Sequence, residues 1–141
     1  MRYFLAIALL LSAQPLAAGV LVPAVPDSFV GHWAGSPSAC ESDFDDLRLH
    51  ISSEHISYWE SEGPILAVVV RGREVALISE LSGEGRTWLA TAKFTISAHG
   101  GLLSDSYSVP GERIVRYKCP ETDAVQRPNS SLKRTDQSLR D

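Results

Sequence analysis

Short runs in which apolar and polar residues alternate follow one another along most of the chain. In residues 46–51, Leu47, Leu49 and Ile51 fall on one face, while Arg48 and His50 fall on the other. This period of two is typical of β-strands that bury one face. Similar runs, separated by turn residues, lie at residues 55–61, 65–71, 74–81, 87–97, 102–109 and 112–119. The run at residues 65–71 is apolar at nearly every position, which predicts a strand covered on both faces.

These runs, with a further strand that opens at Gly31, make about eight strands joined by short connections. Short hairpin links require neighbouring strands to be antiparallel. An eight-stranded meander tends to close on itself, because closure removes both exposed edges. We therefore predict an all-β fold, an antiparallel up-and-down barrel, with a two-sheet β-sandwich as the alternative.

The first residues have the layout of a secretory signal peptide. Arg2 precedes an apolar run from Tyr3 to Leu11, and small residues follow at Ala17, Ala18 and Gly19. The run is about half of the ~20 residues that span a bilayer. We expect cleavage between Ala17 and Gly19, and hence a periplasmic or secreted protein without a transmembrane segment.

The 141 residues fit a single domain with two different ends. We assign residues 1–18 to the signal peptide, 19–28 to an extended segment with two prolines, 29–119 to the barrel, and 120–141 to a disordered tail. The tail has few large apolar residues and cannot bury enough surface to become ordered. The net charge of −4 argues against nucleic acid as a partner. We expect a monomer.

The chain has two cysteines, Cys40 and Cys119, one near each end of the predicted barrel. In an oxidising compartment they can form a disulfide. That disulfide would close a loop of about 80 residues and stabilise the fold by roughly 4 kcal/mol. Two separate buried thiols are the alternative. No Cys-x-x-Cys pair is present, which argues against redox catalysis.

Gly31 and Trp33 form a Gly-x-Trp motif at the start of the first barrel strand. In this context the chain resembles the lipocalin-like (calycin) barrels, which begin with the same motif. The resemblance implies that Trp33 closes one end of the barrel, with Arg113 or Arg116 packed across its ring. It leaves open whether the interior holds a ligand cavity or is filled by side chains.

The chain also resembles the small secreted bacterial inhibitors of metalloproteases. They are exported, of similar size, eight-stranded, and built around Gly-x-Trp. In that family the residues before the first strand enter the protease cleft. The matching segment here runs from Gly19 to Ser28, and its two prolines would reduce the entropy lost on binding.

A polar strand face carries the best candidate for an interaction patch, formed by Arg48, His50, His55 and Trp59. The two histidines face each other across a hairpin if Ser52 and Ser53 are the central turn residues. They have no evident third ligand, so we predict no metal site. Trp59 would mark a binding surface if exposed, unless a neighbouring element covers it.

No catalytic motif stands out in the sequence. It contains no Gly-x-Ser-x-Gly elbow, phosphate loop or His-Glu-x-x-His motif. A carboxylate pair at Glu60 and Glu62 keeps an enzyme open as a third class. We predict a non-enzymatic binding protein without a cofactor, for an apolar small molecule in the barrel mouth or another exported protein. The alternative function is inhibition of a secreted hydrolase through residues 19–28.

Overall fold

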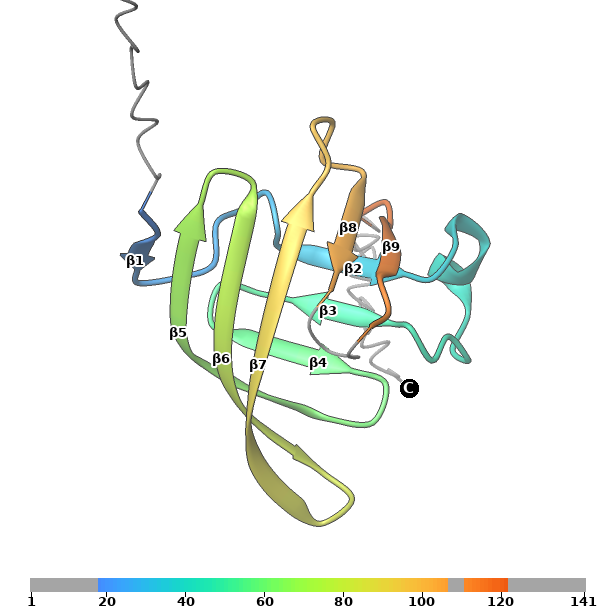
Figure 1. Cartoon of the computed structure of the whole chain (residues 1–141). Coiled ribbons are helices and arrows are strands. Elements are labelled where there is room, and N and C mark those ends of the chain that lie inside the picture. Colours follow the sequence, from blue (N-terminus) through green and yellow to red (C-terminus); the bar gives the residue numbers. More distant parts are fainter. Residues whose placement is uncertain (1–17, 107–110, 122–141) are drawn as a thin grey trace, which may run out of the picture.

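The computed structural model describes residues 18–106 and 111–121 (Figure 1). The predicted signal peptide, apart from Ala18, therefore lies outside the described residues. So does most of the predicted tail. The strands are β1 (Val20–Val22), β2 (Gly31–Ala34), β3 (Leu49–Ile51), β4 (His55–Tyr58), β5 (Glu62–Arg71), β6 (Glu74–Gly83), β7 (Arg86–Ile96), β8 (Leu102–Asp105) and β9 (Ile114–Lys118). A short 3-10 helix, η1 (Pro37–Glu41), follows β2.

Strands β2 to β9 form a closed antiparallel barrel. Each strand pairs with the next along the chain, and β2 also pairs with β9, where Trp33 lies opposite Lys118. This last pairing joins the first barrel strand to the final one, so the strands β2 to β9 form a closed ring. The predicted all-β, eight-stranded barrel is confirmed, and the two-sheet sandwich is not what forms.

The strands differ in length, and this shapes the barrel. In Figure 1, β5, β6 and β7 stand side by side across the front, while β2, β3 and β4 cross behind them. The β6–β7 hairpin extends well beyond the other strands at the bottom of the view. It is paired along its full length, from Glu74 opposite Thr95 to Gly83 opposite Arg86. The inner face of this hairpin therefore continues past the barrel end.

The barrel interior is filled by apolar side chains. The buried core consists of Val25, Phe29, Trp33, Leu49, Ile51, Ile56, Val68, Val75, Leu77, Leu81, Ala92, Phe94, Ile96 and Leu103. Trp33 and Phe94, two of its largest members, have no exposed surface. Side chains of this size pack closely in protein interiors, so the core of the barrel is a packed apolar cluster.

An extra strand, β1, lies within the segment predicted to be merely extended. β1 pairs with residues 68–70 of β5, whereas β4 pairs with residues 62–64 of the same edge. β1 thus covers the part of the β5 edge that β4 leaves unpaired. Val25 is buried, and its N–H donates to the carbonyl oxygen of Ser53 at 2.9 Å. Residues 19–28 are therefore attached to the barrel at two places.

The prediction that residues 65–71 are covered on both faces is wrong. The side chains of Leu66 and Val69 are 56% and 37% exposed. The register of β5 against β6 shifts between Ile65 and Ala67, which inserts one extra residue as a β-bulge. Val68 faces the core beyond the bulge, and no described element covers the outer face of this strand.

Two glycines allow the β4–β5 turn to lie against β6. A Cβ on Gly63 would collide with the carbonyl oxygen of Glu80. A Cβ on Gly83 would collide with the carbonyl oxygen of Glu60. The turn at residues 59–61 is thus held close to the base of the projecting hairpin, where it borders the barrel mouth.

Candidate functional site: the barrel ends and the Trp59 face

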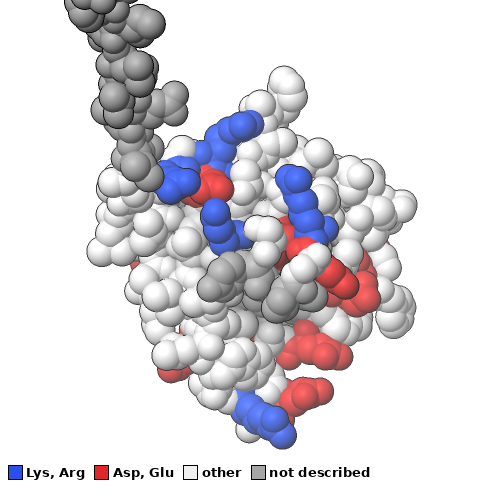
Figure 2. Space-filling view, viewed as in Figure 1, with Lys and Arg blue, Asp and Glu red and all other residues white. Residues whose placement is uncertain are grey.

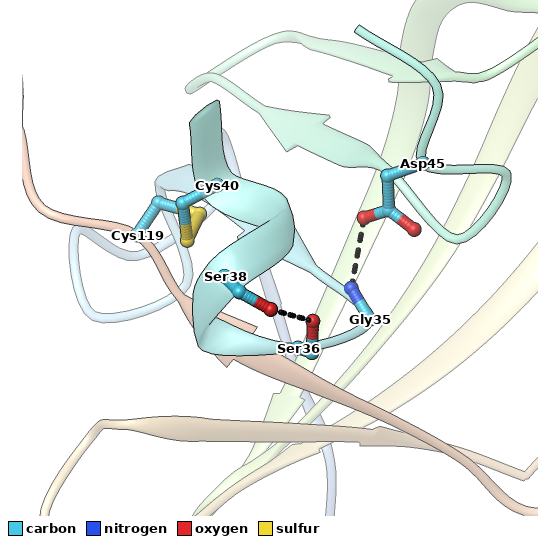
Figure 3. The surroundings of a disulfide bond; sticks show 6 residues. All are labelled: Gly35, Ser36, Ser38, Cys40, Asp45 and Cys119. Carbon is cyan, nitrogen blue, oxygen red and sulfur yellow. Dashed lines mark hydrogen bonds between the residues drawn. A yellow bond between two sulfur atoms is a disulfide. The ribbon is translucent and has the colours of Figure 1, made fainter. Parts of the chain in front are cut away.

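The disulfide is confirmed: Cys40 on η1 and Cys119 after β9 are bonded, with their Cα atoms 5.5 Å apart (Figure 3). Nearby, the Asp45 carboxylate accepts the Gly35 N–H at 2.8 Å and the Leu47 N–H at 3.1 Å. These bonds hold the connection between β2 and β3 beside the disulfide. This end of the molecule is a cross-linked structural support.

Trp33 is fully buried, and the cation over its ring is Lys118. The ammonium nitrogen lies 5.4 Å from the ring centroid, and the indole N–H donates to the carbonyl oxygen of Phe29 at 3.0 Å. The expectation of Arg113 or Arg116 at this place is therefore corrected. Lys118 takes the position because it lies directly opposite Trp33 in the β2–β9 register.

The two arginines have other partners. Arg116 is buried; its Nε donates to the carbonyl oxygen of Leu47 at 2.7 Å, and its Nη1 lies 3.6 Å from the Asp105 carboxylate. Burial lowers the pKa of Arg116, and Asp105 opposes this shift. Arg113 donates from Nη2 to the Ser104 hydroxyl at 3.1 Å. Arg116 thus links β8 and β9 to the loop before β3.

Arg48 and Trp59 come together on the outer side of the β3–β4 hairpin. The guanidinium carbon lies 5.0 Å from the ring centroid of Trp59. Trp59 remains 36% exposed, so no neighbouring element covers it fully. A cation over an exposed indole stabilises the contact by about 0.5–1 kcal/mol and fixes the orientation of the ring.

The two histidines of the predicted patch do not face each other. His50 lies opposite Ser57 on β4 and opposite His32 on β2. The turn is centred one residue later than expected, on Ser53 and Glu54, and the Ser52 N–H donates to the carbonyl oxygen of His55 at 2.9 Å. His55 instead lies 3.6 Å from the Glu62 carboxylate. The described residues contain no group of three or more metal-ligating side chains.

His32 shares its strand face with His50 and has a perturbed pKa. Burial is the main cause that lowers the pKa of His32, and the nearby His50 and Arg48 lower it further. Its Nε2 is buried and makes no hydrogen bond in the structure. Protonation of His32 is therefore less favourable than in a free histidine, mainly because burial removes water from the charged imidazole.

A groove of about 540 Å³ opens at the barrel mouth, beside the projecting β6–β7 hairpin. It is lined by Asp46, Tyr58, Trp59, Glu60, Ser61, Leu81, Ala90 and Thr91. Leu81 is buried and Ala90 packs against the core, so the groove has an apolar floor. Asp46 and Glu60 place two exposed carboxylates at its rim.

A second hollow, of about 470 Å³, continues from the groove along the hairpin. It shares Glu60 and Ser61 with the groove and adds Arg86, Thr87 and Trp88. Trp88 lies opposite Leu81 and is 42% exposed. Trp59 therefore borders the groove and Trp88 borders the neighbouring hollow, and both side chains are partly exposed.

Most groove residues were not predicted from the sequence. Trp59 was singled out because it falls on a polar strand face, and Glu60 only as a possible half of a carboxylate pair. Alternation places Leu81 and Ala90 on the core side of their strands. It does not reveal that the β6–β7 hairpin extends beyond the other barrel strands. The run at residues 87–97 is the longest in the sequence, but only the strand pairing shows that it projects past the barrel end.

No family model, curated protein or solved structure matches the chain. The barrel is compatible with a lipocalin-like architecture in strand number and antiparallel pairing. Among the helices that the structure describes, none has the length and apolar character needed to cross a bilayer.

Proposed function

We propose that this chain is an exported, lipocalin-like, non-enzymatic binding protein that takes its ligand in the groove at the barrel mouth. The observation that carries the proposal is the groove beside Trp59, which has an apolar floor and an aromatic wall, with a second hollow beside Trp88 next to it. Small-molecule sites in proteins are typically concave hollows of about 300–1,000 Å³ with aromatic linings. The filled barrel interior supports a ligand at the mouth instead of one enclosed in the barrel.

The lining favours a ligand with an apolar body and a positively charged group. Leu81 and Ala90 provide an apolar floor, and Trp59 provides an aromatic wall. Asp46 and Glu60 provide negative charge at the rim, which attracts a cation and repels an anion. Arg48 is already placed over the Trp59 ring and so adds rigidity to the wall.

A non-enzymatic role is proposed because the carboxylates do not form a pair around one site. Glu60 lines the groove, whereas Glu62 opens β5 beside His55 on the outer surface. Retaining and inverting glycosidases need two carboxyl groups that face the same bond. No cofactor enters the proposal.

Inhibition of a secreted hydrolase through residues 19–28 has less support. Val20 and Leu21 are exposed and accessible to a partner. However, β1 is paired with β5, and Val25 is buried in the core. Insertion into a protease cleft would require these contacts to break, at a cost in free energy that the binding would have to offset.

The groove is tested by titrating the disulfide-bonded protein with two fluorescent probes, the cationic dye rhodamine 6G and the anionic dye 8-anilinonaphthalene-1-sulfonate. We expect rhodamine 6G to bind saturably at one site, as measured by anisotropy. The Trp59→Ala and Glu60→Gln variants should each weaken its binding by about tenfold or more.

The matched control is His99→Ala, an exposed residue in the β7–β8 turn that is not among the groove residues. This variant should bind both dyes as the unmodified protein does. Equal binding of the dye by the Trp59→Ala and unmodified proteins would show that the groove is not the site. Stronger binding of the anionic dye would overturn the proposed charge of the ligand.

A further inference from the structure

A continuous apolar surface covers the outer side of β5, β6 and β7. It is formed by Leu21 on β1, Leu66, Ala67 and Val69 on β5, Ala76 and Ile78 on β6, and Leu89 on β7, and we call it the outer sheet face. The register places its members side by side. Leu21 lies opposite Val69, which lies opposite Ala76, and Ala67 lies opposite Ile78.

The large side chains of this face are unusually exposed. Leu21 is 72% exposed, Leu66 56%, Val69 37%, Ile78 43% and Leu89 68%. A shallow hollow of about 320 Å³ lies at the centre of the face. Figure 2, in the same view as Figure 1, shows a broad uncharged area over β5 and β6, below a group of basic side chains. Contiguous apolar surface of this kind marks an interaction site in proteins that function in water.

Charged side chains bracket the outer sheet face with opposite signs. At one end, Glu74 lies 3.7 Å from Arg71 and 3.0 Å from Lys93, so two cations surround one carboxylate. The other end of the outer sheet face carries two glutamates. Glu80 lies opposite Leu89 in the register, and Glu62 lies opposite Ser82. One end therefore carries an excess of positive charge, and the other carries negative charge.

We propose that the outer sheet face binds a second copy of this chain across a two-fold axis. In such an arrangement the two sheets pack face to face in opposite directions. The apolar centre of each copy then meets that of the other, and the Arg71 and Lys93 end of each meets the Glu80 and Glu62 end of the other. A two-fold interface must be self-complementary, and this charge pattern has that property. Face-to-face packing of sheets is also a common way to bury such surfaces.

The dimer goes beyond the proposed ligand site and replaces the monomer expected from the sequence. It uses neither Trp59 nor Glu60, which border the mouth groove. It rests on the face that the β-bulge turns outward, at Leu66, and on the absence of any described element over that face. Failure of the dimer and failure of the ligand site are therefore separate results.

Sedimentation velocity of the protein purified without reductant tests the proposal, over protein concentrations up to about 1 mM. A dissociation constant of about 1 mM corresponds to very weak association. We expect a reversible monomer–dimer equilibrium with a dissociation constant below that limit. Val69→Asp should weaken dimerisation by about a hundredfold, because each two-fold interface would contain two buried carboxylates. A sedimentation coefficient that stays monomeric throughout the concentration range overturns the proposal.

The matched control is Val115→Asp, because Val115 on β9 is also 37% exposed but lies outside the outer sheet face. It should dimerise as the unmodified protein does. Circular dichroism establishes that both variants are folded. Equal loss of dimer in the two variants would mean that the interface lies elsewhere.

A charge exchange tests the orientation independently of the apolar substitution. Arg71→Glu should weaken the dimer, because it places negative charge opposite the acidic end of the other copy. Adding Glu80→Arg in the same chain should restore dimerisation, because the reversed pattern is again self-complementary. Both positions are on exposed strand faces, so folding should be retained. Failure of the double variant to recover the dimer overturns the antiparallel arrangement.

Discussion

Single residues at the Trp33 end of the barrel show how one glycine supports a larger contact. Gly31 has a φ of +138°, a conformation that residues with a Cβ rarely adopt. A Cβ at this position would also lie 3.3 Å from Cε of Lys118. The glycine therefore lets the lysine stem lie close to β2 while its ammonium reaches the Trp33 ring. The Gly-x-Trp motif reflects this packing.

Close approach of backbones at Gly63 leads to a sharp prediction at the residue scale. Gly63→Ala should lower the free energy of unfolding by about 3 kcal/mol or more, because the new methyl group collides with the backbone of β6 at Glu80. Urea denaturation measures this loss. The control is Gly101→Ala, whose added Cβ would meet no atom within 4 Å. It should change stability by no more than about 0.5 kcal/mol, and a similar loss in both variants would contradict the packing argument.

Two elements modify the simple barrel, and each has a distinct physical role. The β6–β7 hairpin is longer than its neighbours, and its inner face becomes one wall of the mouth groove. β1 pairs with the upper part of the β5 edge, which β4 does not reach. An unpaired edge presents hydrogen-bonding groups that can pair with another chain, so we predict that β1 limits such pairing at this part of β5.

Removal of β1 tests that role at the element scale. A protein that begins at residue 24 should be less stable by about 1–2 kcal/mol and should form oligomers through the exposed β5 edge. Urea denaturation and size-exclusion chromatography measure the two effects. The control is Val20→Thr, which reduces apolar surface but keeps the strand pairing. If the truncated protein had the same unfolding free energy and the same elution volume as this control, β1 would have no protective role.

The whole molecule depends on closure of the barrel between β2 and β9. That seam has two paired positions, Trp33 with Lys118 and Ala34 with Tyr117. The Cys119 N–H extends it by donating to the carbonyl oxygen of His32 at 2.9 Å. The disulfide joins Cys119 to Cys40 on η1, directly after β2 along the chain. The cross-link therefore reinforces the shortest junction of the barrel.

Loss of the disulfide should affect both global stability and this seam. The Cys40→Ser/Cys119→Ser variant opens a loop of 79 residues and should lose roughly 4 kcal/mol of unfolding free energy. Hydrogen exchange should show lower protection at β2 and β9 than at the long β6–β7 hairpin. The unmodified protein in reductant should behave in the same way. Uniform loss of protection over all strands would argue against a special role at the seam.

Much of the fold could be predicted because its signals are local. Alternation along the strands identified the eight barrel strands, and short links required antiparallel neighbours. The disulfide followed from two cysteines at the ends of the predicted barrel. Trp59 was placed on a polar strand face, and it lies partly exposed next to Arg48. Each of these predictions depends on the strand period, on residue counts or, for the disulfide, on the expected oxidising compartment.

Register across strands was harder to predict. A shift of the turn after Ser52 moved His50 away from His55 and placed it opposite Ser57. The cation over Trp33 depended on how β2 meets β9, across more than 80 residues of chain. Hairpin register is set by turn geometry, and the seam register is set by closure of the whole barrel. Neither is contained in the alternation of a single strand.

By itself, the sequence determined the all-β class, the order of the strands and the pair of cysteines, because backbone alternation and chain order are local properties. Only the tertiary structure decided that the interior is filled, that the mouth groove forms beside Trp59, and that one face of β5 stays exposed. These features depend on how far the β6–β7 hairpin extends beyond the other strands and on the bulge at Leu66. Both arise when the barrel closes, since closure sets the register of every strand against its neighbours.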